Sequence, residues 1–385
     1  MVSNISHIHP LLVDSLNLMP GSTFKYKDCS QMWQQARRKL VSFILCSVIA
    51  ITPHSANAQN NSDTYDKNKP LDILLDEKIE YYRQQYPEIS FLVLQGGEDL
   101  IADVMALDLI LGHQPSSLDY EHPQKLREDL MIASANRILL MLQHGMPSAS
   151  LFKVNNPLDW QAHICVLTIN PTEVSADSIR ATQNLLDLPR EFVEKIPQDF
   201  RLQPADYLEF VIDHEVYHCL YSMYVGPQKM SYKTFWAEYN SFLNEQGADA
   251  FALGMHINSR HEVPSFAENI MRIRGVALMS GDPDHLTCKA LQQIVNIPPK
   301  DLAEMSVNEI FDNANRIQKR LTISYDEYIQ YLAASVQAMK ELGVEALIAE
   351  DLRNRIKDTK ADPSQVRELV TNTRRFLSEL SCEEG

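Results

Sequence analysis

The feature that most constrains this 385-residue chain is a pair of histidines four positions apart, His214 and His218, within the stretch Val211–His218. Positions i and i+4 of an α-helix lie about 40° apart around the axis and one turn along it, so the two imidazoles project side by side and can bind one metal ion. Glu215 lies about 100° around the helix from His214, where it can reach a water on the metal without binding the metal itself. The stretch therefore predicts a helix that carries part of a catalytic metal site.

The residues around the histidine pair favour a helix. Pro204 suits a first helical turn, Leu208 and Val211 provide an apolar face, and no glycine or proline interrupts residues 205–225. H-E-x-x-H fixes only three letters and also occurs on ordinary helices, so further support must come from a third ligand. A catalytic zinc ion usually has three protein ligands and a fourth position for water.

A second helix, expected over Tyr232–Ile257, carries the segment Asn244–Asp249, in which the carboxylates of Glu245 and Asp249 lie one turn apart on one face. Together with H-E-x-x-H, this N-E-x-x-x-D segment resembles the gluzincins, the thermolysin-like zinc metallopeptidases. The resemblance implies that Glu245 is the third zinc ligand. It also implies that Asp249 accepts a hydrogen bond from His214, which would fix the tautomer and orientation of that ring.

Two other third ligands remain open. Glu238 lies seven residues before Glu245 on nearly the same face, although no aspartate follows it one turn later. Asp249 itself could bind the metal, as in aspartate-type zincins. A metzincin is excluded, because Tyr221 and Tyr224 occupy the positions where that family needs a glycine and a third histidine.

Gluzincins also place a histidine or tyrosine downstream that donates a hydrogen bond to the oxyanion. His285, which has acidic neighbours, is the preferred candidate here, and Tyr221, Tyr224 and Tyr232 are alternatives. In this interpretation the zinc ion polarises a water and the scissile carbonyl, while Glu215 takes up a proton and delivers it to the leaving amine.

Residues 1–58 have the pattern of a leader with a secretory signal peptide. The basic residues 37–39 precede the apolar run 40–52, which is too short to span a bilayer, and a small-x-small cleavage pattern ends at Ala58. Translation could begin at Met32. The alternatives are an uncleaved anchor and a buried N-terminal helix. We therefore expect an exported protein, periplasmic or secreted, without stable membrane insertion after cleavage.

An exported chain would keep the four cysteines after the leader, which allow two disulfides whose pairing the sequence does not define: Cys165, Cys219, Cys288 and Cys382. Cys219 directly follows His218 but points in a neighbouring helical direction. That position favours a packed thiol or a half-cystine over a metal ligand.

The patterning predicts a predominantly helical α+β fold with a zincin-like helix pair, a small sheet and a C-terminal helical region. Strands are expected at Ile89–Leu94 and Ala162–Asn170, the second being either an edge that binds the substrate backbone or an interior strand. Further helices are expected at Leu71–Tyr86, Asp99–Leu111, Gln124–Gln143, Ala176–Leu186, Arg190–Lys195, Pro299–Leu321, Ser324–Leu342, Val344–Lys357 and Pro363–Leu380. The expected organisation is a leader (1–58), a linker (59–70), a catalytic region (71–258) and a C-terminal helical region (259–385).

The chain is acidic, with a formal net charge of −16 at pH 7, and loss of the leader would remove five basic and only two acidic residues. This charge argues against nucleic acid and anionic membrane surfaces as partners. Together with the leader pattern, the resemblance to gluzincins implies an exported zinc metallopeptidase that acts on peptides or proteins. The lack of an upstream G-x-M-E-N signature favours an endopeptidase. The alternatives are a catalytically silent zinc- or peptide-binding protein of the cell envelope, and a helical interaction protein in which the motif is accidental.

Overall fold

The computed structural model describes residues 69–96, 146–155, 161–186, 201–226, 236–275 and 284–329, with the single positions 138, 194 and 198. The described part is mostly helical and contains a small sheet, which confirms the predicted α+β class. The leader and the helices predicted at 99–111, 124–143, 190–195 and after residue 329 lie outside the described residues, apart from isolated positions. Among the described helices, none is both long enough and apolar enough to span a membrane.

The elements that the structure describes follow one another along the chain in this order: α3 (Leu71–Gln85), β1 (Ile89–Leu94), β2 (Ser148–Asn155), β3 (Gln161–Thr168), α6 (Pro171–Ser175), α7 (Ser178–Leu186), α9 (Pro204–Leu220), the π-helical turn η3 (Tyr221–Val225), α10 (Trp236–Arg260), α11 (Ser265–Gly275), α13 (Cys288–Val295), α14 (Pro299–Ala303) and α15 (Val307–Arg320).

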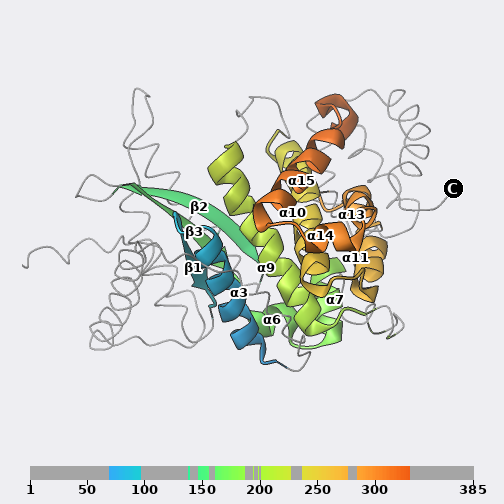
Figure 1. The fold of residues 1–385 in the computed structure, drawn as a ribbon, viewed down its shortest axis with the longest axis horizontal. Helices are drawn as coiled ribbons and strands as arrows, with labels where there is room; N and C mark the ends of the chain where they lie inside the picture. The colour runs from blue at the N-terminus through green and yellow to red at the C-terminus, as the bar shows by residue number, and fades with distance from the viewer. Residues whose placement is uncertain are drawn as a thin grey trace, which may run out of the picture.

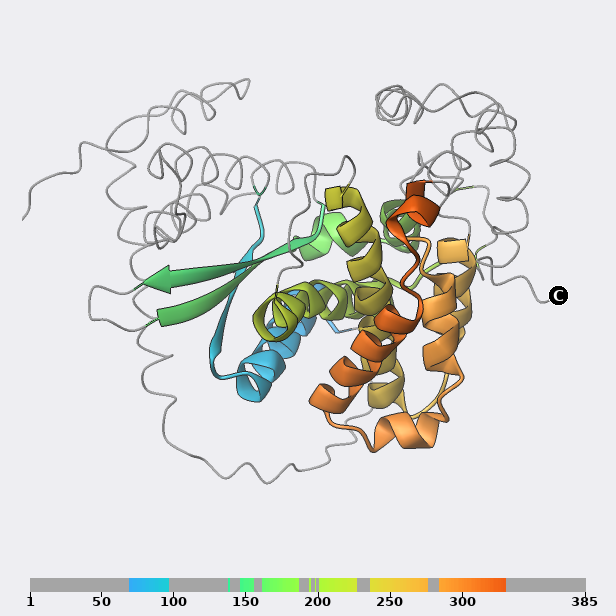
Figure 2. The same ribbon diagram turned by 90° about the horizontal axis from the view of Figure 1, so that it is seen from above.

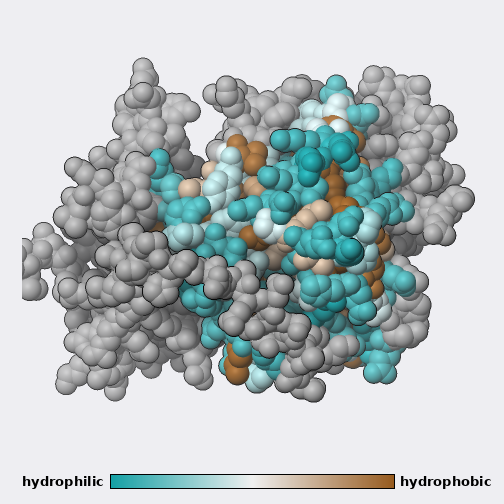
Figure 3. All heavy atoms as spheres, in the orientation of Figure 1, coloured by the Kyte–Doolittle hydropathy of each residue, from teal (hydrophilic) through white to brown (hydrophobic). Residues whose placement is uncertain are grey.

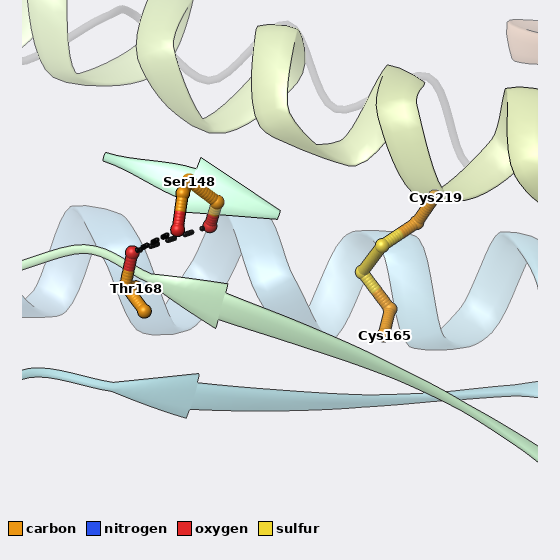
Figure 4. Close-up of a disulfide and its surroundings, with 4 residues drawn as sticks. All are labelled: Ser148, Cys165, Thr168 and Cys219. Carbon is orange, nitrogen blue, oxygen red and sulfur yellow. Dashed lines mark hydrogen bonds between the residues drawn. A yellow bond between two sulfur atoms is a disulfide. The ribbon is translucent and has the colours of Figure 1, made fainter. Parts of the chain in front are cut away.

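The sheet has the strand order β1-β3-β2, with β1 parallel and β2 antiparallel to β3. The strand predicted at Ala162–Asn170 is therefore interior, and residues 164–169 are all buried. Of the two alternatives for this strand, the interior strand is confirmed and the substrate-binding edge is wrong. The sequence does not predict β2, because its residues, SASLFKVN, show no sustained alternation of polar and apolar side chains. At one end of the β2–β3 pair, the hydroxyls of Ser148 on β2 and Thr168 on β3 lie 2.6 Å apart (Figure 4).

Helix α9, which carries the histidine pair, lies between two groups of elements (Figures 1 and 2). It packs against α3 and β2 on one side and against α10 on the other. Nearly all of its side chains are buried, including polar ones. The predicted helix over residues 205–225 is present, with η3 as its last turn, and Gly226 follows with a φ of 85°, a left-handed conformation that glycine adopts without steric cost.

Ion pairs attach α9 to both neighbouring helices. Asp213 is fully buried and accepts hydrogen bonds from Lys78 Nζ at 2.9 Å and from the Tyr82 hydroxyl at 2.6 Å, both on α3. Glu209, in the first half of α9, pairs with Arg260 at the end of α10, with 2.9 Å between oxygen and nitrogen. Since the early part of α9 meets the end of α10, the two helices run antiparallel, and their middle residues face one another.

Helices α13, α14 and α15 pack against α10, whereas α11 packs mainly against α13, and all of them contribute to one hydrophobic core. The sequence predicts one helix over Pro299–Leu321, but the structure has two, α14 and α15. The Ser306 side chain caps α15 and the Glu309 side chain bonds back to it, a capping box that starts a new helix. Residue 258, the predicted end of the catalytic region, lies within α10, and the division of the chain there stays a prediction.

A disulfide joins Cys165 of β3 to Cys219 of α9 (Figure 4). Both cysteines are fully buried. Cys219 is therefore a half-cystine, and Cys288 is disulfide-bonded as well. The Cys165–Cys219 bridge attaches the end of α9, one residue after His218, to the interior strand of the sheet.

The described surface is mostly hydrophilic on the face shown in Figure 3, where apolar side chains appear only in small groups. The exposed large hydrophobic side chains among the described residues are dispersed along the chain: Ile73, Met146, Tyr224, Val225 and Val263. Single exposed apolar side chains are ordinary for a folded protein.

We expect the variant C165A/C219A to lose about 4 kcal/mol of unfolding free energy, because the cross-link restricts the unfolded chain over a sequence separation of 54 residues. Unfolding in guanidinium chloride measures the difference. Alkylation followed by mass spectrometry of the wild type provides the control. Free thiols at both positions, or equal unfolding midpoints for the two proteins, would contradict the bridge.

We expect G247A to be destabilising, although alanine is favoured over glycine by about 1 kcal/mol inside most helices. A Cβ at Gly247 would lie 2.1 Å from the Tyr217 hydroxyl and 2.5 Å from Gln318 Oε1. Overpacking of this kind costs about 1–3 kcal/mol, which urea unfolding would detect. The variant S241A, on the same helix, is the control and should be neutral or slightly stabilising. A more stable G247A would mean that α9 and α10 are farther apart than described.

Candidate metal centre

Helices α9 and α10 bring three predicted site residues together. His214, His218 and Glu245 each offer one ligand atom, and these atoms lie within 4.8 Å of one another. The Nε2 atoms of the two histidines are 3.2 Å apart, Glu245 Oε2 lies 2.8 Å from His214 Nε2, and Glu245 Oε1 lies 3.5 Å from His218 Nε2. Among the described side chains this is the one such group found, and it could hold a metal ion.

Asp249 lies on the far side of His214 from this group. The Nδ1 atom of His214 donates a hydrogen bond of 2.8 Å to Asp249 Oδ1, so the hydrogen bond that the gluzincin resemblance implies is present. It leaves His214 Nε2 facing the other donors, and Asp249 is not among the grouped ligand atoms. Glu238 belongs to α10, but its side chain lies outside those described, so that alternative stays open.

The Asp249 carboxylate has two further partners that the sequence motifs do not reveal. Arg274 on α11 approaches both of its oxygens, with Nε 2.7 Å from Oδ2 and Nη2 3.1 Å from Oδ1, and the Thr287 hydroxyl donates to Oδ2. Burial alone would raise the pKa of Asp249, but Arg274 and His214 hold it well below its ordinary value. The only sequence signal for Arg274 is general, since a buried carboxylate needs a cationic partner somewhere in the chain.

The donor atoms suit a cation. When Nδ1 of neutral His214 carries its proton, Nε2 can only accept, and it faces Glu245 Oε2 at 2.8 Å. Glu245 Oε2 is buried, and it has no proton to accept from His214 Nε2 while that nitrogen is unprotonated. A metal ion among these lone pairs would satisfy them, and two imidazole nitrogens with one carboxylate oxygen form the donor set of catalytic zinc sites that keep a fourth position open.

Without a metal ion, a proton supplies the positive charge. Burial opposes a charge on His214, but Glu245 and Asp249 outweigh it and raise the pKa of His214 to about 9. Burial lowers the pKa of His218 to about 4, so the proton resides on His214. Burial would raise the pKa of Glu245, but His285, His218 and His214 together hold it well below its ordinary value.

Of the two predicted catalytic residues, the structure brings His285 beside the metal group. Glu215 is buried on α9, next in sequence to His214. The Nε2 atom of His285 lies 3.1 Å from Glu245 Oε2, and the ring centroids of His285 and His214 are 5.9 Å apart. His285 is not part of the ligand group, a position that suits a hydrogen-bond donor beside the metal better than a fourth protein ligand.

The three tyrosines that are alternatives to His285 as the oxyanion donor have different contacts or lie outside the described residues. The Tyr224 hydroxyl donates to Glu88, and the Tyr221 ring packs against that of Tyr217, with 5.8 Å between ring centroids. Tyr232 lies outside the described residues. Of these candidates, His285 is the one that the structure brings next to a ligand of the metal group.

No protein-family model, curated protein or solved structure matches this chain. The likeness to gluzincins therefore rests on the two motifs and on the side-chain geometry just described.

We expect zinc binding to release about one proton at pH 7, because His214, with a pKa of about 9 in the metal-free chain, must lose its proton before it can bind the metal. Zinc affinity should therefore rise with pH, by about tenfold per pH unit between about pH 7 and 9, and then level off. Calorimetric titrations in buffers of different ionisation enthalpy count the protons.

The variant D249N is the matched control for that titration. It removes one of the charges that raise the pKa of His214, so it should release fewer protons and bind zinc about 10- to 100-fold more weakly. An affinity that does not change with pH over this range would contradict the assignment of the proton to His214.

Proposed function

We propose that this protein is an exported zinc-dependent metallopeptidase and acts as an endopeptidase. One observation carries the proposal: two histidines of α9 and a glutamate of α10 converge on one point, with Asp249 bonded behind His214. These donors come from separate helices. In the neutral form of His214, its Nε2 atom and Glu245 Oε2 are buried acceptors that face one another, and a divalent cation between them would satisfy both.

The chemistry follows from the surrounding side chains. A zinc ion held by His214, His218 and Glu245 would supply Lewis acidity and lower the pKa of a water. Glu215, adjacent to the first ligand, would take a proton from that water and return it to the leaving amine. His285, next to Glu245, would donate a hydrogen bond to the developing negative charge.

The sheet supports a peptide substrate. Among the described residues β2 pairs with β3 alone, and β2 packs against α9. The edge of β2 that pairs with no described strand would accept an extended peptide backbone close to the helix that carries the histidines. This assigns to β2 the substrate-binding role that the sequence offered for residues 162–170.

The redox state supports export. The disulfide between Cys165 and Cys219 is of a kind that persists in oxidising compartments outside the cytosol. It agrees with the signal-peptide pattern of residues 1–58, and the location outside the cytosol remains part of the proposal.

The test is E215Q, which should keep zinc at one ion per chain and lose about 10²- to 10⁴-fold in peptide hydrolysis, because an amide cannot act as the general base. Zinc is measured by atomic absorption, and hydrolysis with casein and a quenched-fluorescence peptide library. E304Q, an exposed glutamate on the surface, is the matched control for charge. Full activity in E215Q would contradict the proposed role of Glu215 as the general base. A wild type that binds zinc without cleaving any peptide would favour the silent binding protein.

A further inference from the structure

His285 lies in a short non-helical segment, Asp284–Thr287, which we call the His285 turn and which directly precedes α13. Such a segment has no helical or sheet ladder to fix it, so its position beside Glu245 depends on hydrogen bonds to other elements.

Side chains from two elements hold the His285 turn. Gln246 on α10 donates to the carbonyl of Leu286 at 3.0 Å, and the Tyr328 hydroxyl donates to Asp284 Oδ1 at 3.1 Å. The third attachment is Thr287, which is fully buried and donates its hydroxyl to Asp249 Oδ2. The Thr287 backbone N–H in turn donates to the His285 carbonyl at 2.8 Å.

The Thr287 hydroxyl does not cap the helix that Thr287 precedes. Thr287 is the N-cap residue of α13, where a threonine hydroxyl ordinarily accepts a hydrogen bond from the first turn and stabilises the helix by about 1 kcal/mol. No side-chain capping bond is present here. The hydroxyl instead donates to a carboxylate on another helix, so local helix stability does not explain it.

Besides Arg274, which approaches both of them, the two oxygens of Asp249 have different partners. Oδ1 holds the ring of His214, while Oδ2 accepts from Thr287. We propose that Thr287 is a positioning residue, which fixes His285 relative to the metal ligands by attaching the His285 turn to Asp249. The proposal deepens the metallopeptidase function and rests on it for the role of His285, but the attachment itself can be tested without catalysis.

The test compares T287V, which removes the hydroxyl and keeps the shape, with T287S, which keeps the hydroxyl. In T287V we expect kcat to fall about 10- to 100-fold, the cost of a displacement of about 1 Å at a reacting group, with KM and zinc stoichiometry unchanged. T287S should restore most of the rate. T182V controls for the general loss of a buried hydroxyl. Thr182 is also buried, but its hydroxyl donates to the Ser178 carbonyl of α7 and accepts from the Leu202 backbone N–H.

A double-mutant cycle with H285A asks whether Thr287 acts through His285. If it does, T287V has no further effect on the rate of H285A. Additive losses would overturn the proposal. A loss of zinc in T287V that matches its loss of rate would also overturn it, because Thr287 would then act through Asp249 and His214 alone.

Hydrogen exchange decides the attachment independently of hydrolysis. The amides of residues 285–287 should exchange faster in T287V than in T287S. They should also exchange faster in Y328F than in the wild type, because Y328F removes the hydrogen bond to Asp284 and leaves Asp249 untouched. Equal exchange in T287V and T287S would overturn the proposal. If the wild type cleaves no peptide while this exchange difference is present, the proposed function fails and the attachment of the turn stands.

Discussion

A carboxylate with no access to water, Asp249, organises the centre of this protein. A buried charge is strongly destabilising unless cationic and hydrogen-bonding partners reach its oxygens. Its partners come from three different elements: His214 from α9, Arg274 from α11 and Thr287 from the start of α13. Satisfying this one group therefore brings together helices that are distant in sequence, and it orients the first metal ligand at the same time.

A second buried carboxylate, Asp213, attaches another face of α9 to α3. Asp213, the residue before His214, is buried against Lys78 and Tyr82 of α3. Neighbouring residues on a helix point about 100° apart, so one turn of α9 is attached to α3 on one face and to α10 through Asp249 on another. With the disulfide from Cys219 to the sheet, the turn that carries both histidines has little freedom to rotate. A metal site gains from such support, since ligands held in place need no reordering on binding.

The limits of sequence reasoning follow from the same geometry. His214, His218, Glu245 and Asp249 were predictable, because each pair lies on one helix, where spacing alone defines which side chains share a face. The positions of Arg274 and Thr287 were not, since they depend on how α11 and the segment before α13 return to α10 and no local pattern encodes that. The sequence does not predict β2, because its residues lack sustained alternation. It predicts a single helix at 299–321, because the apolar spacing continues across the capping box at Ser306.

The charge balance of the centre explains how it can exist with and without a metal ion. In the metal-free state the negative charges of Glu245 and Asp249 are matched by Arg274 and protonated His214. A divalent ion that displaces this proton leaves one positive charge in excess among the same groups. In the proposed peptidase, such an excess would favour the negative charge that develops when an amide is hydrolysed. Arg274 would thus matter in both states, because without it the centre would carry one more negative charge without the ion, and no net positive charge with it.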